Sequence, residues 1–438
     1  MKKYIIIIIS CLASLLTSCV HDTEALFDKP AAERMAESLQ AYRQLLTAQT
    51  NGWLVEYYPE KTQKYGGFNL YFRFDGESVT VRSEINPSAL ATSSWTMGSD
   101  MGPTINFDTH NTVLHYFSDP AMNQGGGRGL NYEGDYEFYV ESGSETEFIL
   151  RGKKTRNIIR MTPLPAHLSW EGYSQILNVM DQNVIAPAYK MTVGGREISI
   201  EKSIGANVFT LKTGNTTVSA PFIVTLTGIK FYEPITIGDE TMQTFIYQVD
   251  SDKIVSDRNN AEISMMMIPL SKYFVDNLVF TSWYFATDNI GPGCLSAWTT
   301  AKNSLLNYQG YQFRLAFMWL GSIDVNHPAG VSIGVFDEED QLMYVGTYVY
   351  DFEILSNDQV KFTFNQAKSN AIGNIASFFS NAVSGFTISV FNGKTFTLVP
   401  DRDLTNPKNV VRIDKLTLID AANSNNWVKV VLEEKLWP

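Results

Sequence analysis

The sequence predicts a mainly β protein made of antiparallel barrel-like or sandwich modules, lipocalin-like barrels among the options, with two or three short helices. Short apolar strands bounded by turn residues recur about every ten residues, a spacing typical of antiparallel sheets. Aromatic residues make up 13% of the 438 residues and charged residues 18%, which favours strands. A parallel sheet needs a helix between most strands, and the chain has too few helical segments for one.

Three segments have the period of a helix. Asp28 is placed to cap the first, Pro30 suits its first turn, and Asn51-Gly52 ends it. Its apolar stripe consists of Met35, Leu39, Tyr42 and Leu46. A second helix is predicted from Ser169 to about Asp181, and a third over residues 371–383. The apolar side of the second consists of Tyr173, Ile176, Leu177 and Met180.

Three hairpins are predicted with explicit registers. Two have two-residue loops, at Asp75-Gly76 and Gly194-Gly195, and the third has a three-residue loop over 391–393 with Gly393 in the left-handed region. The predicted pairs are Phe72 with Val79, Leu70 with Val81, Met191 with Ile198, Tyr189 with Ile200, Ile388 with Phe396, and Phe386 with Leu398. In every pair, two apolar side chains share a face.

Further strands follow from alternating or continuous apolar residues. They are predicted at 53–58, 104–107, 113–117, 136–140, 148–151, 158–161, 222–227, 245–249, 331–336, 342–350, 360–364 and 428–432. The prolines at 163 and 165 and the polar run 250–260 are the candidate breaks. We expect a helix-plus-β module over 28–165, a second over 166–270, either separate from the first or continuous with it, and a C-terminal β module over 271–438.

The first residues have the pattern of a bacterial lipoprotein signal. Lys2 and Lys3 precede an apolar run, and Leu16-Thr17-Ser18-Cys19 supplies small residues before a cysteine. We expect cleavage between Ser18 and Cys19, removal of 1–18, lipidation of Cys19, and an acylated tether over 19–27. The alternative, a transmembrane anchor, needs about 20 apolar residues, and this run is shorter. Several acyl chains would hold the protein firmly on a membrane.

Charge and cysteine content narrow the partners. The formal net charge is −12, and loss of Lys2 and Lys3 with the signal would make it −14, so we expect no nucleic-acid partner. Of the three cysteines, Cys11 would leave with the signal and Cys19 would be acylated. Cys294 would then stand alone and no intramolecular disulfide would form, which suits an oxidising compartment.

No catalytic, cofactor or metal motif is complete in this chain. His110 and His115 are the only neighbouring histidines, and on an extended strand they would point to opposite faces. The glycine run 125–129 lacks the Lys-Ser/Thr ending of a phosphate loop. A calcium loop starting at Asp250 fails because Val255 and Ala261 occupy its glycine and glutamate positions. We expect no cofactor.

Other candidate features have structural readings that compete with functional ones. The acidic run 337–340 is read as a solvated hairpin tip rather than a calcium site, and Met265, Met266 and Met267 as packing. Core packing is also the favoured interpretation for the aromatic residues that are candidates for binding sugar rings, which are Trp95, Trp298, Trp319, Tyr57, Tyr58 and Tyr116. Two carboxyls that hydrolyse a glycoside can come from anywhere in the sequence, so a hydrolase stays open.

Segments 27–34, 51–59 and 102–117 resemble an uncharacterised family of Bacteroidota lipoproteins commonly encoded near SusC/SusD-like nutrient-uptake pairs. The resemblance implies an outer-membrane setting and no catalytic residues. Asp22 and Glu24 look like the acidic signal that sends such lipoproteins to the cell surface, although Val20-His21 departs from it.

The leading hypothesis from these observations is a non-catalytic, lipid-anchored protein of the outer membrane, facing the cell exterior. It would capture a glycan or peptide nutrient for an uptake complex. Two alternatives stay open, a surface hydrolase on a β scaffold and a structural or adhesive lipoprotein.

Overall fold

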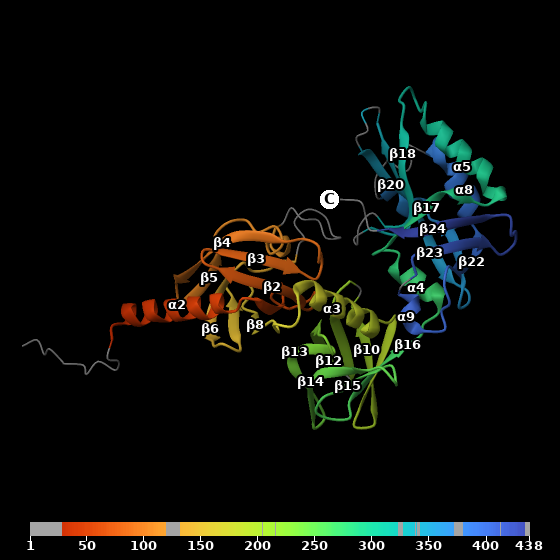
Figure 1. The fold of residues 1–438 in the computed structure, drawn as a ribbon. Helices are drawn as coiled ribbons and strands as arrows, with labels where there is room; N and C mark the ends of the chain where they lie inside the picture. The colour runs from red at the N-terminus through yellow and green to blue at the C-terminus, as the bar shows by residue number, and fades with distance from the viewer. Residues whose placement is uncertain are drawn as a thin grey trace, which may run out of the picture.

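The computed structural model contains three closed barrels, each of eight antiparallel strands (Figure 1). It describes residues 29–119, 132–203, 205–214, 216–322, 327–337, 339, 342–371, 380–411 and 413–433. In every barrel each strand pairs with its neighbours in the sequence, and the first strand closes on the last. Closure leaves no unpaired sheet edge. The predicted mainly β, antiparallel barrel-like architecture is confirmed.

Barrel 1 follows the long helix α2 (Ala31–Ala48). Its strands are β1 (Trp53–Tyr57), β2 (Phe68–Asp75), β3 (Ser78–Ser83), β4 (Ala91–Ser99), β5 (Pro103–Phe107), β6 (Glu137–Gly143), β7 (Phe148–Gly152) and β8 (Ile158–Pro163). The helix ends at Ala48, before the predicted Asn51-Gly52, and Gly52, whose φ is +85°, belongs to the turn that follows. Large aromatic side chains such as Trp53, Phe72 and Trp95 fill the interior.

Barrel 2 follows α3 (Trp170–Val184), whose N-cap is Ser169 as predicted. Its strands are β9 (Ala188–Val193), β10 (Arg196–Lys202), β11 (Val208–Thr213), β12 (Thr216–Val224), β13 (Gly228–Ile237), β14 (Glu240–Gln248), β15 (Lys253–Ser256) and β16 (Glu262–Met266). The polar run 250–260 therefore includes a barrel strand. α3 buries Tyr173 and Leu177 as expected, but Ile176 is exposed.

Barrel 3 carries more helices than the sequence predicted. Its strands are β17 (Ser282–Ile290), β18 (Arg314–Gly321), β19 (Gly330–Phe336), β20 (Leu342–Ile354), β21 (Gln359–Phe364), β22 (Lys394–Pro400), β23 (Lys415–Asp420) and β24 (Trp427–Glu433). The helices are α4 (Leu270–Asn277), α5 (Pro292–Leu305), α6 (Gln366–Ala371), α8 (Ser380–Phe391) and α9 (Pro407–Val410). α5 and α8 lie side by side on the barrel (Figure 1).

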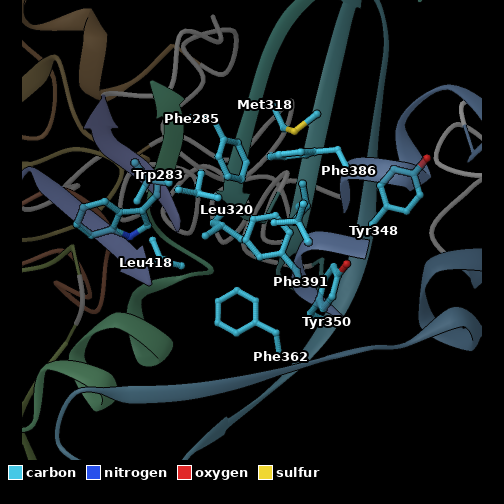
Figure 2. Packing of buried hydrophobic residues seen from close by; sticks show 14 of the residues in the cluster. Trp283, Phe285, Met318, Leu320, Tyr348, Tyr350, Phe362, Phe386, Phe391 and Leu418 are labelled. Carbon is cyan, nitrogen blue, oxygen red and sulfur yellow. The ribbon is translucent and has the colours of Figure 1, made fainter. Parts of the chain in front are cut away.

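The third predicted hairpin is wrong, because residues 380–391 form α8 rather than a strand. Phe386 and Phe391 of this helix lie among the barrel side chains (Figure 2). The ring of Phe391 stacks on Phe362 at 5.8 Å between centroids, and Phe386 is 4.8 Å from Trp298. Gly393, at φ +73°, follows the helix end instead of closing a hairpin. Of the predicted helix over 371–383, residues 372–379 lie outside the described residues.

The two earlier hairpins have different outcomes. At Gly194-Gly195 both glycines have positive φ, and both predicted pairs are confirmed. At the first hairpin the loop is Gly76-Glu77 instead of Asp75-Gly76. Phe72 therefore pairs with Val81 and Phe74 with Val79, a shift of two residues that keeps the same faces together.

One further predicted strand is wrong and the others overlap observed strands. Residues 113–117 form a turn and the 3-10 helix η1 (His115–Phe117), because Asn111 Oδ1 accepts hydrogen bonds from the backbone N–H groups of Val113 and Leu114. Asp28, the predicted cap of the first helix, lies outside the described residues, and Pro30 takes the N-cap position.

Direct hydrogen bonds join barrel 1 to barrel 2. The backbone N–H of Gly67 donates to Phe222 O at 2.9 Å, and that of Asn207 donates to Tyr65 O at 3.0 Å. Lys230 Nζ lies 2.8 Å from Glu56 Oε1, with both side chains largely shielded from solvent. These contacts fix the junction on which the candidate site is built.

A buried lysine connects barrel 3 to barrel 2. Lys408 of α9 donates from Nζ to the hydroxyl of Tyr247 at 2.8 Å and to the carboxylate of Asp252. Tyr247 belongs to β14 and Asp252 to the turn that follows it.

Candidate functional site

The cleft beside α3 is the candidate functional site, with a volume of about 630 Å³. Barrel 1, α3 and barrel 2 all contribute to its walls, and Figure 1 shows α3 at the junction of the two barrels. Its polar and charged lining consists of Arg82, Glu84, Ser88, Glu171, Ser174, Gln175, Asn178, Asp181 and Asn207. Ligand sites of small molecules are commonly clefts of this size between domains.

α3 is held against barrel 1 by aromatic packing. Tyr71 of β2 stacks on Trp170 at 5.7 Å between ring centroids and meets Tyr173 edge-on at 5.5 Å. Its hydroxyl also bonds to Ser174 Oγ at 3.2 Å. Because residues three or four apart share one helix face, this orientation turns Glu171, Gln175, Asn178 and Asp181 toward the cleft.

Arg82, near the end of β3, is a buried cation in the cleft wall. The residue is 5% exposed, and its Nη2 donates to Glu171 Oε1 at 2.5 Å. Its Nε and Nη1 are buried without a hydrogen-bond partner among the described residues. The bond from Arg82 lowers the pKa of Glu171. Unpartnered buried donors are uncommon in proteins and are often found where a ligand or water binds.

Glu84 is a carboxyl whose surroundings favour its neutral form. Burial, with a further contribution from the charge of Asp181, raises its pKa to about 8. Asn69 opposes this rise, because its Nδ2 donates to Glu84 Oε2 at 2.7 Å. At neutral pH the protonated carboxyl can therefore donate a hydrogen bond into the cleft.

Behind the cleft lies a second titratable group, Lys202 of β10. Burial lowers the pKa of this amine, against the charge of Asp181, which raises it. Its Nζ donates to Ala206 O at 2.9 Å. Lys202 and Asp181 line a narrow extension of about 20 Å³ toward the barrel 2 core.

This arrangement offers hydrogen-bond donors and acceptors with little net charge. Arg82 is balanced by Glu171, and Glu84 is neutral below its raised pKa, which leaves Asp181 as the remaining acidic side chain of the lining. Amides from Gln175, Asn178 and Asn207 supply both donors and acceptors. Such a lining suits a polar, hydroxyl- or amide-rich molecule.

The structure brings the two neighbouring histidines together. Their ring centroids are 4.8 Å apart, because the chain turns at 111–117 and is not extended as predicted. His115 Nδ1 accepts the Asn111 N–H at 3.1 Å, and its ring stacks on Tyr136. Among the described ranges, no group of three or more His, Cys, Asp or Glu side chains is placed to hold a metal ion.

The other sequence candidates lie apart from the cleft. Asp252 binds Lys408 and Tyr247. In the acidic run 337–340, residues 338 and 340 lie outside the described residues, as does the glycine run 125–129. Met265 is buried, as the packing interpretation expects, while Met266 and Met267 are exposed. Cys294 is a buried free thiol.

The aromatic side chains considered for sugar binding are mostly in the core. The buried ones are Trp95, Trp298, Trp319, Tyr57 and Tyr58, each at most 2% exposed. Tyr116 is half-buried. The packing interpretation is therefore confirmed for the buried five.

Sequence reasoning missed the residues that line the cleft. Arg82 and Glu84 follow an apolar strand, and Glu171, Asn178 and Asp181 recur at helical spacing on a predicted helix. The charged residues after the strand and the polar stripe on the helix are both visible in the sequence. Only the junction of the two barrels places them in one cleft.

Ser18 and Cys19, the predicted cleavage and lipidation residues, lie outside the described part of the chain. No helix in the described ranges is both long and apolar enough to cross a membrane.

A family model described as "Domain of unknown function (DUF4302)" matches residues 23–249, more than half of the chain. The chain belongs to the DUF4302 family. The DUF4302 match includes barrel 1, α3 and barrel 2 as far as β14, so it contains the whole cleft beside α3. It ends before β15 and β16, and barrel 3 lies entirely outside it.

Other comparisons add no functional information about this DUF4302 protein. No curated protein matches the chain. Among solved structures, the DNA polymerase sliding clamp from Caulobacter crescentus is 9% identical, with 91% of this chain and 98% of that chain covered and a TM-score of 0.12. Kievitone hydratase from Nectria haematococca is also 9% identical, with 89% and 90% covered and a TM-score of 0.13. Similarities this low carry no argument about fold or function.

Proposed function

We propose that this protein is a lipoprotein of the outer membrane, anchored through Cys19 and facing the cell exterior, that captures a nutrient in the cleft beside α3. The ligand is a glycan or a peptide, delivered to a SusC/SusD-like uptake complex. The observation that carries the capture role is the lining of the cleft, where amides, a neutral carboxyl and a buried guanidinium surround about 630 Å³. The signal-like N-terminus and the resemblance to Bacteroidota lipoproteins support the location.

Capture is tested by binding. The full chain in detergent is applied to a panel of plant and host glycans and peptides, and each hit is measured by calorimetry. Gln175→Ala with Asn178→Ala removes two exposed cleft amides and should weaken a hit about thirtyfold, since each of the two bonds contributes roughly 1 kcal/mol. Asn303→Ala, an exposed amide on α5, is the matched control. Retention of no ligand in the panel would refute capture.

The anchor has a separate test. Mass spectrometry of the native protein should find an acylated Cys19 at the N-terminus, and Cys19→Ala should move the protein from the membrane fraction to the soluble fraction. A variant that still sediments with membranes would exclude lipidation as the anchor.

A surface hydrolase is the second candidate, favoured by Glu84 and Asp181. They line one cleft, and the pKa of Glu84, about 8, keeps it protonated near neutral pH, as a general acid requires. If the panel yields products, Glu84→Gln and Asp181→Asn should each abolish turnover while ligand binding persists. Intact ligands after prolonged incubation would leave capture alone.

A further inference from the structure

A second cleft, of about 520 Å³, lies between barrel 1 and barrel 2 and shares no lining residue with the cleft beside α3. Its barrel 1 wall comes from the β1–β2 connection and the β7–β8 turn. Its barrel 2 wall comes from β12 and β13. We call it the basic cleft, after the charges described next.

Three cations and one carboxylate line the basic cleft, in a chain with a net charge of −12. The cations are Lys61, Arg151 and Arg156, and the carboxylate is Glu233. Arg151 Nε already donates to Glu141 at 2.6 Å. Lys61 and Arg156 are exposed and have no carboxylate partner among the described residues. The cleft therefore presents positive charge that the protein does not neutralise.

The backbone around this cleft is held in an uncommon conformation. Among the described residues, six that are not glycine have positive φ, and three of them flank the cleft: Glu60 at +56°, Gln63 at +54° and Arg156 at +68°. Side chains with a Cβ rarely adopt this region, and such residues concentrate at functional sites.

Buried polar groups hold these strained residues in place. Asn157, 3% exposed, donates from Nδ2 to Tyr58 O at 2.9 Å and to Glu60 O at 2.6 Å, and accepts from Gln63 Nε2 at 2.5 Å. Nearby, the buried Asp135 carboxylate accepts from the backbone N–H of Lys154 and from Thr155 Oγ1, each at 2.5 Å. The wall that carries Lys61 and Arg156 is thus ordered before any ligand arrives.

Tyr232 adds a fixed, partly exposed ring to the opposite wall. Its hydroxyl accepts the backbone N–H of Ile158 at 2.8 Å, and its ring lies 4.7 Å from the buried Tyr58 ring. An aromatic face fixed beside cations and side-chain amides and hydroxyls can pack against a sugar ring while polar groups bind its substituents.

We propose that the basic cleft binds acidic saccharides. Lys61 and Arg156 contact the carboxylate or sulfate group, Tyr232 packs against the ring, and Ser219 and the Oε1 atom of Gln63 bond to hydroxyls. The site is separate from the cleft beside α3, so it stands whether or not that cleft captures a nutrient.

The test uses the full chain in detergent with four probes of similar length. They are an oligogalacturonate for the carboxylate, a chondroitin sulfate oligosaccharide for the sulfate, a neutral xylo-oligosaccharide, and oligoglutamate as an acidic peptide. Calorimetry should show binding of at least one acidic saccharide, weakened by added salt, and about tenfold or greater preference over the neutral one.

Variants assign the binding to this cleft. Lys61→Ala with Arg156→Ala should reduce affinity for the acidic saccharide at least about tenfold. Arg196→Ala with Lys415→Ala also removes two positive charges, from exposed positions outside the basic cleft, and should change the affinity little. Arg156→Gly should lose affinity while the melting temperature stays equal or rises, since glycine accepts φ +68° without strain.

Three results would overturn the proposal: equal binding of neutral and acidic saccharides, unchanged affinity in the Lys61/Arg156 variant, or oligoglutamate binding more tightly than both acidic saccharides. All three results concern the basic cleft alone, because the cleft beside α3 is tested by a different variant, at Gln175 and Asn178.

Discussion

Asn69 Nδ2 donates both to Glu84 Oε2, at 2.7 Å, and to the carbonyl of Val224, at 3.0 Å. One amide on β2 thereby positions a cleft carboxyl and ties barrel 1 to β12 of barrel 2. Because Asn69 is buried, neither bond is readily replaced by water. The protonation of Glu84 is therefore coupled to the junction between the two barrels.

Glu84 should make stability fall as pH rises. Its pKa is about 8 in the folded protein against an ordinary 4.5, so the folded state holds an extra proton between these values. This contribution is fully present below the ordinary pKa and is lost as pH rises through about 8. Glu84→Gln cannot ionise, so from acidic to mildly alkaline pH it should gain about 2 to 4 kcal/mol relative to wild type in denaturant unfolding.

Glu171→Gln is the control with the opposite sign. The Arg82 bond lowers the pKa of Glu171, so its contribution is present above the ordinary pKa and is lost as pH falls through the lowered one. This variant should be destabilised at neutral pH and approach wild type in acid. If the stability difference from wild type changed with pH in the same direction for both variants, the opposite pKa shifts of Glu84 and Glu171 would be contradicted.

The family match ends before barrel 2 is complete, which predicts where the chain can be cut. β16 pairs with β9 to close the barrel, so residues 29–268 should fold alone and melt cooperatively. Residues 29–249 lack β15 and β16 and should expose two open edges. Circular dichroism and calorimetry distinguish the two fragments. If residues 29–249 melted cooperatively at the same temperature as residues 29–268, β15 and β16 would not be required for folding.

Lys408 should control how barrel 3 is held. Its side chain is 8% exposed, and Lys408→Met removes the bonds to Tyr247 and Asp252. We expect faster proteolysis of the connection at 267–269 and a loss on the order of 1 to 3 kcal/mol. Adding Asp252→Asn should recover part of the loss, since no charge is then left without its partner. Proteolysis at the wild-type rate would show that other contacts dominate.

Two glycine substitutions test whether residues 380–391 are helical. Gly385 lies exposed within α8 and Gly393 has φ +73°, and an added Cβ meets no atom within 4 Å at either. Gly385→Ala should therefore stabilise by about 0.5 to 1 kcal/mol, and Gly393→Ala should destabilise by about 1 kcal/mol. Thermal melts of the two variants measure both changes in stability. If Gly385→Ala destabilised the protein, the predicted hairpin would be favoured over the helix.

Local sequence patterns predicted a segment correctly where its hydrophobic period and its cap or turn residues indicated the same structure. Ser169 capped a helix as expected, and Gly194-Gly195 gave the right register because both positions need positive φ. Pattern could not place the loop at Gly76, since a shift of two residues leaves the same apolar faces together.

Residues 380–391 misled because nearly every side is buried or apolar. Phe386, Ile388 and Val390 alternate with Thr387 and Ser389, which is the period of a strand. The cleft beside α3 was beyond reach for another reason. Asn69, Arg82, Asp181 and Asn207 meet only through the junction of two barrels, and no periodicity within the chain encodes that contact.

Closure of first strand on last has a consequence for synthesis. Trp53 pairs with Pro163, so β1 must wait for the whole of barrel 1 to emerge before its outer edge is covered. The hairpins between neighbouring strands can form as soon as they are synthesised. Until β8 has been synthesised, the free edge of β1 can pair with an incorrect strand. With three such closures in one chain, we expect each barrel to be prone to aggregation until its last strand has been synthesised.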